Sequence, residues 1–213
     1  MDNHETFRNP LENCRKIGIM GGTFNPIHAG HLLMGRFAKE YADLDAVVFV
    51  PAGLPHMKKN IGLLSGRERL YMVEQSIKGE KDFYASSIEI DRNGQTYTYE
   101  TIAELHEKYP FAQLYFILGA DSLFSFDRWL YPEKILSHCN LIAAARNGSV
   151  TSELRDVSNM LMNKYGGEIF IMEFPTLDIS STMIRERVKN GKSIRYLTTD
   201  AVCDYIEAHN LYL

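Results

Sequence analysis

Short runs of apolar residues alternate along this chain with longer segments whose apolar positions recur at helical spacing. The runs are rich in β-branched and aromatic residues, as in strands that are buried on both faces of a parallel sheet. They lie at 17–20, 46–50, 114–118, 140–145 and 168–172, and a further strand is predicted at 87–90. Helical spacing follows residues 31, 65 and 98 and covers 151–165 and 181–190. The alternation predicts an α/β fold, a doubly wound parallel sheet with helices on both faces.

The most informative stretch follows the first of these runs. Gly21 and Gly22 allow a tight turn and a close approach of the backbone to a ligand, and Asn25-Pro26 is typical of a turn. His28 and His31 stand three residues apart at the start of the next helix and project to the same side. Because a helix N-terminus behind such a turn binds phosphate, we expect both histidines to reach one anion. A lone histidine here would more often cap the helix or pack against a neighbour.

A second helix start carries three hydroxyl side chains. Ser180, Ser181 and Thr182 open the helix, and Gly191 ends it as a C-cap would. Hydroxyls and free N–H groups together form an anion site, and Arg185, one turn into the helix, adds a fork of donors suited to phosphate oxygens. Taken alone, the pattern is more often a structural cap followed by a surface arginine.

Polar residues also follow the runs at 46–50, 114–118 and 140–145. The carboxyl ends of parallel strands form the edge of an open α/β sheet where ligands bind. The residues at this edge are His56, Lys58, Lys59, Gly119, Asp121 and Arg146. Each charged side chain has an ordinary alternative, since loop lysines and arginines are usually solvated and Asp121 is placed to cap the following helix.

Two further features have ordinary structural explanations when they are considered alone. Thr96, Tyr97 and Thr98 give the helix that follows a hydroxyl-rich start, for which capping is the common explanation. Trp129 is the only tryptophan of the chain. Its indole face suits stacking on a planar heterocycle, although most tryptophans simply belong to the core.

Composition narrows the class of protein. With 213 residues, 45% of them hydrophobic and 23% charged, a single soluble domain over 16–213 is expected, preceded by a polar extension at 1–15. A net charge of -4 argues against a broad surface for nucleic acid. Three widely spaced cysteines support neither a disulfide framework nor a zinc site and fit a reducing cytoplasm. No apolar run is long enough for a membrane span.

Residues 21–31 resemble the (T/G)xxHxGH signature of the nucleotidylyltransferase superfamily, and 179–185 resembles its I-S-S-T-x-I-R motif residue for residue. Weaker likenesses to the nicotinate-mononucleotide adenylyltransferases of this superfamily lie between and after them. These are a P-x-x-P-P-H-K loop at 51–59, an S-Y-T-x-x-T-(L/I) motif at 96–102, the segments at 119–122, 126–130 and 146–148, and the ending at 198–212. The resemblance covers Lys16 to Leu213 and implies a Rossmann-like fold of the nucleotidylyltransferase type.

The resemblance implies roles for individual residues. His28, His31 and Arg185 would act on the phosphates at the transfer site; Gly21, Gly22, Thr23, Phe24, Gly119, Asp121, Ser181 and Thr182 would bind ATP; and His56, Lys58, Tyr97, Thr98, Trp129 and Arg146 would bind the acceptor. Two departures from the family pattern matter. Asn25 stands where the family more often has Asp, so no charged role is assigned to it, and Met57 displaces the loop lysine, which leaves the choice between Lys58 and Lys59 open.

The reaction implied by the resemblance joins nicotinate mononucleotide to the AMP portion of ATP and gives deamido-NAD and pyrophosphate. A phosphate monoester has a second pKa of about 6, so the attacking phosphate needs no general base. Catalysis would then consist of positioning and electrostatic stabilisation. Mg²⁺ would arrive bound to ATP, and no dedicated metal site in the protein is expected.

Several alternatives stay open. The acceptor could be nicotinamide mononucleotide or phosphopantetheine, although Trp129 with Thr96–Thr98 argues against the second. The chain could also be a non-catalytic nucleotide sensor on the same fold. A dinucleotide-dependent oxidoreductase is poorly supported, because the first turn lacks the Gly-x-Gly-x-x-Gly pattern. ATP and nicotinate mononucleotide are the expected partners, with neither nucleic acid nor membrane, and the sequence does not decide between a monomer and a homo-oligomer.

Overall fold

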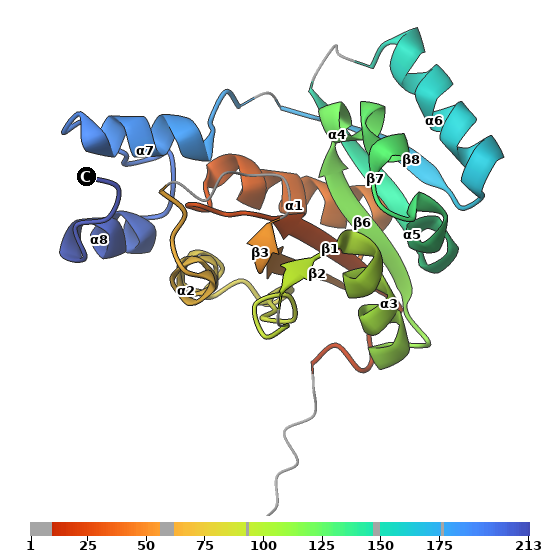
Figure 1. The fold of residues 1–213 in the computed structure, drawn as a ribbon, viewed down its shortest axis with the longest axis horizontal. Helices are drawn as coiled ribbons and strands as arrows, with labels where there is room; N and C mark the ends of the chain where they lie inside the picture. Colours follow the sequence, from red (N-terminus) through yellow and green to blue (C-terminus); the bar gives the residue numbers. More distant parts are fainter. Residues whose placement is uncertain (1–9, 56–61, 93, 147–149, 176) are drawn as a thin grey trace, which may run out of the picture.

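The computed structural model describes residues 10–55, 62–92, 94–146, 150–175 and 177–213. Its centre is a six-stranded sheet in the order β4-β2-β1-β6-β7-β8, in which every neighbouring pair is parallel (Figure 1). The strands are β1 (Lys16–Gly22), β2 (Ala46–Pro51), β4 (Phe83–Ala85), β6 (Gln113–Gly119), β7 (Cys139–Arg146) and β8 (Ile169–Phe174). The predicted doubly wound parallel sheet is therefore confirmed.

Helices cover both faces of the sheet. They are α1 (Ala29–Ala42), α2 (Gly66–Ser76), α3 (Thr98–Lys108), α4 (Ala120–Phe124), α5 (Pro132–His138), α6 (Ser152–Tyr165), α7 (Ser181–Lys189) and α8 (Asp200–Ala208), with a 3-10 turn η1 (Phe126–Arg128). Figure 1 shows α7 and α8 beside α2 at one end of the molecule, and α4 to α6 toward the other. The helix expected after residue 65 begins with a capping box, in which Ser65 and Glu68 bond to each other's backbone N–H groups.

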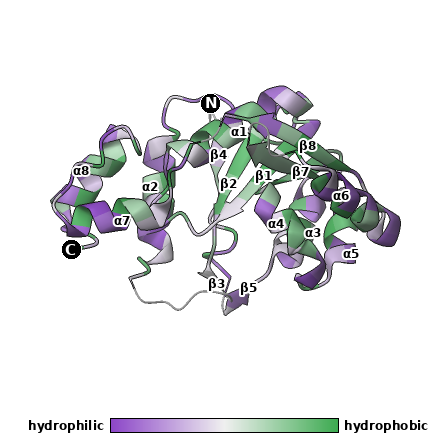
Figure 2. Ribbon diagram, turned by 90° about the horizontal axis from the view of Figure 1, so that it is seen from above, coloured by the Kyte–Doolittle hydropathy of each residue, from purple (hydrophilic) through white to green (hydrophobic). Residues whose placement is uncertain are grey.

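The strands contribute side chains to two hydrophobic cores, one on each face of the sheet, because successive side chains of a strand point to opposite faces. On β6, Leu114 and Phe116 join the core beneath α3, α5 and α6, whereas Tyr115 and Ile117 join the core beneath α1, α2, α7 and α8. Most residues of β2 are apolar and buried on both sides, as the continuous run predicts. The strands at the centre of Figure 2 are accordingly coloured mainly as hydrophobic.

One predicted strand is wrong. Residues 88–90 form a turn, and the edge strand lies earlier, at Phe83–Ala85, where it pairs with β2. The turn is closed by two bonds between Ser87 and Asp91, one from the Asp91 N–H to the Ser87 carbonyl at 2.8 Å and one from the Ser87 hydroxyl to the Asp91 carboxylate at 2.5 Å. This local bonding replaces the ladder that a strand would need, and it frees Glu89 to point elsewhere.

A second, two-stranded sheet had no signal in the sequence pattern. It joins β3 (Leu54–Pro55) to β5 (Gln95–Thr96) in parallel. Two-residue strands are too short to show an apolar alternation. The small sheet nevertheless brings the segment after β2 against the start of α3, at the carboxyl edge of the main sheet.

The boundary predicted at residue 16, between the N-terminal extension and the domain, stays a prediction. Of the extension, only residues 10–15 are described, and within them Leu11 is buried against the core. Across the described ranges, the structure contains no helix that is long and apolar enough to cross a membrane.

Candidate active site

A cavity of about 580 Å³ opens at the carboxyl ends of β1 and β2. β1 pairs with both β2 and β6, so the chain passes to either side of it, and this reversal is where open α/β sheets bind ligands. The described residues that line the cavity include Gly21, Gly22, Thr23, Ala52, Glu89, Thr96, Tyr97, Thr98, Thr101, Phe116, Arg128, Trp129 and Leu130. Several residues of both predicted sites therefore face one space.

One side of this space is the turn between β1 and α1. At Gly22 a Cβ atom would lie 2.8 Å from the ring of Phe24, so the buried phenyl ring leaves no room for a side chain. Phe24 itself has a positive φ of 48°, and α1 begins at Ala29 after His28 in the N-cap position. The backbone thus reaches the helix start through a tight turn. Gly21 and Gly22 themselves lie in β1, paired with Val50 and Pro51, so the turn follows the glycine pair instead of forming at it as predicted.

The two histidines lie together at the start of α1. Their rings stack with centroids 3.7 Å apart and planes inclined by 24°, and the His28 N–H donates to His31 Nδ1 at 3.3 Å. His28 is only 7% exposed, and burial lowers its pKa to about 4. Its Nδ1 is buried and has no hydrogen-bond partner among the described residues. At neutral pH the His28 imidazole is therefore uncharged in the free protein.

The start of α7 docks onto the same turn. Ser181 Oγ donates to the Pro26 carbonyl at 2.8 Å, and Arg185 Nη1 donates to the Asn25 carbonyl at 2.8 Å. The other Arg185 nitrogen, Nη2, donates to Thr182 Oγ1 at 3.1 Å. Ser180, rather than Ser181, is the N-cap, with its hydroxyl accepting from the Met183 N–H. The two strongest sequence motifs thus meet in space, although more than 150 residues separate them.

We call this assembly the nucleotide end of the site. It comprises Gly21, Gly22, Thr23, Phe24, His28, His31, Ser181, Thr182 and Arg185. Two helix N-termini and one guanidinium meet here, and each favours negative charge. The arrangement is suited to an oligophosphate.

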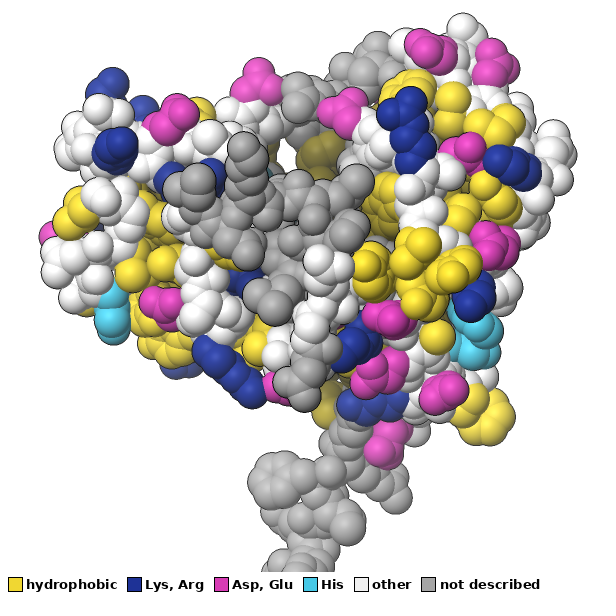
Figure 3. All heavy atoms as spheres, in the orientation of Figure 1, with side chains coloured by type: hydrophobic (Ala, Val, Ile, Leu, Met, Phe, Trp, Pro, Cys, Tyr) yellow, Lys and Arg dark blue, Asp and Glu magenta, His cyan; other side chains and the backbone are white. Residues whose placement is uncertain are grey.

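The other side of the cavity is built from β5, the start of α3, and Trp129. Trp129 is half-buried, with its ring edge-on to Phe116 at 6.0 Å and tilted against Phe126 at 5.2 Å. Tyr97 and Thr98 lie opposite, at the N-cap and first residue of α3. We call Glu89, Thr96, Tyr97, Thr98, Thr101 and Trp129 the acceptor end. Figure 3 shows hydrophobic side chains gathered over α3 and α5 beside it. Leu130 and Tyr131, which directly precede α5, are both exposed.

Comparison with known proteins decides the family. Residues 19–187 match the family described as cytidylyltransferase-like. The chain belongs to the cytidylyltransferase-like family. The match spans β1 to α7, and so includes both ends of the site.

Relatives of similar length lie within this family. The chain is 40% identical over 199 residues to a protein of Lachnoclostridium phytofermentans and 42% identical over 197 residues to one of Exiguobacterium sibiricum, each named "Probable nicotinate-nucleotide adenylyltransferase". These alignments cover 93% and 92% of this chain and 100% and 98% of the relatives.

Solved structures show the same fold. A nicotinic acid mononucleotide adenylyltransferase of Plasmodium falciparum, in a complex with NaAD, has a TM-score of 0.75 at 21% identity, over 93% of this chain and 97% of that chain. The same protein complexed with APC has a TM-score of 0.74. At this level of identity the likeness concerns the fold alone.

Not every predicted residue reaches the cavity of this cytidylyltransferase-like protein. Asp121 is exposed in the first turn of α4, and the N-cap of that helix is Gly119, so the predicted capping role of Asp121 is wrong. His56, Lys58 and Lys59 lie outside the described residues. Arg146 ends β7, and its side chain is not among those described. A role of these residues in binding remains a prediction.

Hydroxyl capping of α3, the ordinary explanation for Thr96–Thr98, is also absent from the described contacts. The N-cap residue is Tyr97, whose side chain makes no capping bond there. The hydroxyls of Thr96 and Thr101 donate instead to Glu89, at 2.9 and 2.8 Å. The sequence analysis missed Glu89, because it treated this acid as part of a strand. An acidic residue in an otherwise apolar run was the available signal.

Arg69 is a second residue that the sequence did not indicate, because it occupies an ordinary position within the helix expected after residue 65. This arginine is 1% exposed and donates to four main-chain carbonyls, those of Thr23 at 2.7 Å, Ala52 at 2.6 Å, Gly53 at 3.1 Å and Leu64 at 3.1 Å. Burial lowers its pKa, which the charge of Glu89 partly opposes. Thr23 and Ala52 both line the cavity. Arg69 therefore holds the turn of the nucleotide end against the loop after β2.

The C-terminal segment, whose sequence at 198–212 resembles the family ending, also reaches the site. The Tyr212 hydroxyl donates to Asn25 Oδ1 at 2.8 Å, and the Asn25 amide donates to the Gly62 carbonyl at 2.9 Å. An aspartate at position 25 could not make the second bond in its ionised form. Within the described ranges, no group of three or more His, Cys, Asp or Glu side chains is arranged to hold a metal ion.

Proposed function

We propose that this protein transfers the AMP portion of ATP to nicotinate mononucleotide and releases pyrophosphate. The observation that carries the proposal is the meeting of two helix N-termini, both histidines and Arg185 at the turn that follows β1. Of that assembly, Gly21, Gly22 and Thr23 line the cavity, whose other end holds Trp129. The first end suits a triphosphate and the second suits a flat ring. Relatives named nicotinate-nucleotide adenylyltransferase support this choice of substrates.

The chemical step is an in-line displacement at the α-phosphorus of ATP. An oxygen of the acceptor phosphate forms the new bond, and the bond from the α-phosphorus to the oxygen of the leaving pyrophosphate breaks. The acceptor phosphate is already mostly dianionic at neutral pH, because its second pKa is about 6. No proton needs to be removed, so the protein requires no general base.

The protein then has to position the phosphates and stabilise the charge that moves onto pyrophosphate. Arg185 supplies a fixed positive charge, oriented by its bonds to the Asn25 carbonyl and the Thr182 hydroxyl. The start of α1 adds the partial positive charge of a helix N-terminus. His28 enters as a neutral imidazole in the free protein, because its pKa is about 4, and so contributes a hydrogen-bonding group rather than a cation.

ATP is proposed to enter as its Mg²⁺ complex, with the ion bound mainly by phosphate oxygens. Such an ion needs no cage of protein carboxylates. The proposed contacts of Gly119, Asp121, His56, Lys58 and Arg146 with substrate are part of the same proposal and rest on the family resemblance.

At the acceptor end, a carboxylate on the pyridine ring needs hydrogen-bond donors. The first N–H groups of α3, at Thr98 and Tyr99, precede the first amide that bonds within the helix, which is the Glu100 N–H donating to the Tyr97 carbonyl. Tyr97 and Thr98 both line the cavity, so the start of α3 forms part of its wall. We infer that these N–H groups receive the carboxylate while the ring stacks against Trp129.

The test is pyrophosphate release from ATP and Mg²⁺ with purified protein, in parallel reactions with nicotinate mononucleotide, nicotinamide mononucleotide and phosphopantetheine. The proposal expects strong preference for the nicotinate form. Equal use of both pyridine nucleotides would retain the reaction and remove the carboxylate-selective pocket. ATP binding with no release for any acceptor would identify a nucleotide sensor instead.

A further inference from the structure

Glu89 is a buried acid in the wall of the acceptor end. It lies in the turn after β4, is only 9% exposed, and lines the same cavity as Trp129 and Thr98. Among the described residues that line this cavity, the charged ones are Glu89 and Arg128, and Arg128 is exposed to solvent. A carboxylate in such a place is costly unless it is well bonded.

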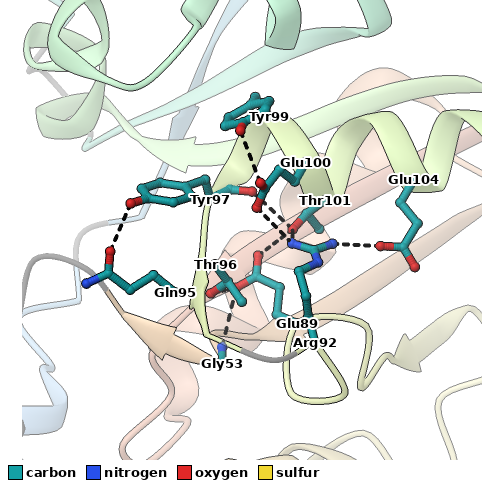
Figure 4. A network of polar contacts seen from close by, with 10 residues as sticks. All are labelled: Gly53, Glu89, Arg92, Gln95, Thr96, Tyr97, Tyr99, Glu100, Thr101 and Glu104. Atoms are coloured by element: carbon teal, nitrogen blue, oxygen red, sulfur yellow. Dashed lines mark hydrogen bonds and ion pairs between the residues drawn. The ribbon is translucent and has the colours of Figure 1, made fainter.

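Three donors from three separate segments converge on this carboxylate (Figure 4). Thr96 Oγ1 in β5 donates to Oε2 at 2.9 Å, Thr101 Oγ1 in the first turns of α3 donates to Oε1 at 2.8 Å, and the Gly53 N–H after β2 donates to Oε2 at 3.4 Å. Gly53 packs so closely that a Cβ atom there would lie 2.3 Å from the Glu89 carbonyl oxygen. One side chain thus joins the loop after β2, β5 and α3.

The bonds fix the two threonines that flank Thr98 in the sequence. A hydroxyl has one hydrogen to donate. Thr96 donates its hydrogen to Glu89 at 2.9 Å, and Thr101 Oγ1 lies closer to Glu89 Oε1, at 2.8 Å, than to the Tyr97 carbonyl, at 3.3 Å. Arg92 Nη1 donates to Thr101 Oγ1 at 3.4 Å. Arg92 in turn forms ion pairs with Glu100 at 3.5 Å and Glu104 at 2.6 Å. The start of α3 is therefore clamped from both sides.

The contacts of Glu89 with Thr96 and Thr101 also place opposite charges around the part of the cavity where the pyridine ring is proposed to bind. The N-terminus of α3 carries partial positive charge, whereas the Glu89 carboxylate is negative. An acidic substituent on a ring in this cavity is attracted toward the helix start and repelled by Glu89. A neutral amide experiences neither effect strongly. The arrangement therefore distinguishes acid from amide by orientation as well as by hydrogen bonding.

We propose that Glu89 is a positioning residue that sets the preference of this site for a pyridine nucleotide bearing a carboxylate. It acts through Thr96 and Thr101, which hold the first N–H groups of α3 where the carboxylate binds. The inference rests on the proposed function, because it concerns the acceptor of that reaction.

The principal test compares Glu89→Gln with the wild type. The substitution keeps the size of the side chain, removes its charge, and replaces one acceptor oxygen with an NH₂ group that faces hydroxyl donors. We expect KM for nicotinate mononucleotide to rise about tenfold or more, the scale of losing a hydrogen bond to a charged group. KM for ATP should stay within about twofold, and the preference for nicotinate over nicotinamide mononucleotide should fall.

Glu107→Gln is the matched control. Glu107 lies on α3, like Thr101, but its side chain is exposed and is not among the residues that line the cavity. This variant should keep the wild-type KM values and acceptor preference. An equal loss in both variants would overturn the proposal, because it would point to a general weakening of α3.

A second pair of variants covers the case in which Glu89→Gln does not fold. Thr101→Val removes one donor to Glu89 and should reproduce the rise in KM for the nicotinate acceptor, whereas Thr101→Ser keeps the hydroxyl and should restore it. Wild-type KM and acceptor preference in Thr101→Val would contradict a positioning role of this cluster.

Binding can be measured without turnover, because Trp129 is the only tryptophan in the chain. Quenching of its fluorescence by nicotinate mononucleotide should require a higher concentration in Glu89→Gln than in the wild type. If wild-type protein binds this ligand but releases no pyrophosphate, the proposed reaction fails while the role of Glu89 is still measured. If wild-type protein turns over and Glu89→Gln binds and selects acceptors equally well, the role of Glu89 is overturned and the reaction stands.

Discussion

The nucleotide end and the acceptor end of the site are built differently. At the nucleotide end, the groups placed to bind phosphate are helix N-termini and residues of two contiguous motifs. The acceptor end depends on single side chains from several elements. The first end is assembled by bonds from Ser181 and Arg185 to main-chain carbonyls of the 25–26 turn. The second is assembled by bonds from Thr96 and Thr101 to one carboxylate, that of Glu89. Both ends are therefore pre-organised. At the first end, side chains bond to the backbone of the turn, whereas at the second end side chains bond to one another.

This difference determines how easily each end can be recognised in a sequence and which substrates a substitution there affects. A phosphate group is bound well by any helix start with a tight turn before it, so the sequence must keep glycines and hydroxyls at fixed spacing. The shape of a ring pocket can be supported from many positions, so its supporting residues need no common spacing. We therefore expect changes at the nucleotide end to affect every acceptor and changes at the acceptor end to affect one substrate only.

Arg69 joins the turn of the nucleotide end to the loop after β2, whose Gly53 N–H bonds to Glu89, and its loss should have the largest effect. Arg69→Met removes donors to the Thr23 and Ala52 carbonyls, and each hydrogen bond to a charged group contributes about 1.5–3 kcal/mol. We expect the free energy of unfolding in urea to fall by about 3–5 kcal/mol and KM to rise for both substrates. Arg67→Met is the control, because Arg67 lies on the same helix but is exposed and paired with Asp91. A rise in KM for only one of the two substrates would contradict this role of Arg69.

His28 should make the protein less stable in acid. Its pKa of about 4 in the folded state lies below its ordinary value of 6.5, so the unfolded chain takes up the proton first as the pH falls. The stability due to the neutral, buried imidazole is present above pH 6.5 and is lost progressively between 6.5 and 4. At about 1.4 kcal/mol for each pKa unit, the loss by pH 4.5 is about 2–3 kcal/mol.

Urea unfolding at pH 7 and pH 4.5 checks this prediction when the wild type is compared with His28→Gln, which cannot titrate. The variant should show a smaller difference between the two pH values. An identical difference in both proteins would mean that other groups cause the acid sensitivity.

The transfer step should depend on His31 and Arg185 whichever acceptor is used. His31→Ala or Arg185→Ala is expected to lower kcat about a hundredfold, the scale of removing one donor to a developing anion. The measurement is steady-state pyrophosphate release with each active acceptor. Arg187→Ala, on the same helix as Arg185 and bonded to the Ser193 carbonyl, should keep kcat near the wild-type value. Near-native turnover in the first two variants would refute their assignment.

Trp129 should have the smallest and most selective effect. Trp129→Leu keeps an apolar contact with Phe116 and Phe126 but removes the stacking face, which is worth about 0.5–1.5 kcal/mol for an aromatic pair. KM for the pyridine nucleotide should rise up to about tenfold, with KM for ATP unchanged. Phe124→Leu, at an exposed position outside the residues that line the cavity, is the comparison. A rise in KM for ATP would show that the two ends are not independent.

The sequence predicted much of the fold because its signals are local. The buried run at 46–50, the capping box of Ser65 and Glu68, and the glycine after α7 each determine structure within a few residues. The same holds for the turn before α1. The meeting of the two motifs could be inferred only from family resemblance, because the bond from Ser181 to Pro26 spans 155 positions and leaves no periodic pattern.

The parts that failed were decided by tertiary contacts. Ile88 and Ile90 suggest a strand around Glu89, but local bonds between Ser87 and Asp91 form a turn instead. Arg69 occupies an ordinary helical position in sequence, and only its surroundings of carbonyl groups reveal what it does. Buried charges of this kind carry no short-range signal, since their partners come from distant segments.

The most direct test of the account is to identify both products from ATP, Mg²⁺ and nicotinate mononucleotide by mass spectrometry and a pyrophosphate assay. The account predicts deamido-NAD and pyrophosphate in equal amounts, with the rates of formation of both lowered together, about a hundredfold, in Arg185→Ala. Pyrophosphate accompanied by free AMP and no dinucleotide would contradict it, because the cavity would then bind and cleave ATP without holding an acceptor at its other end.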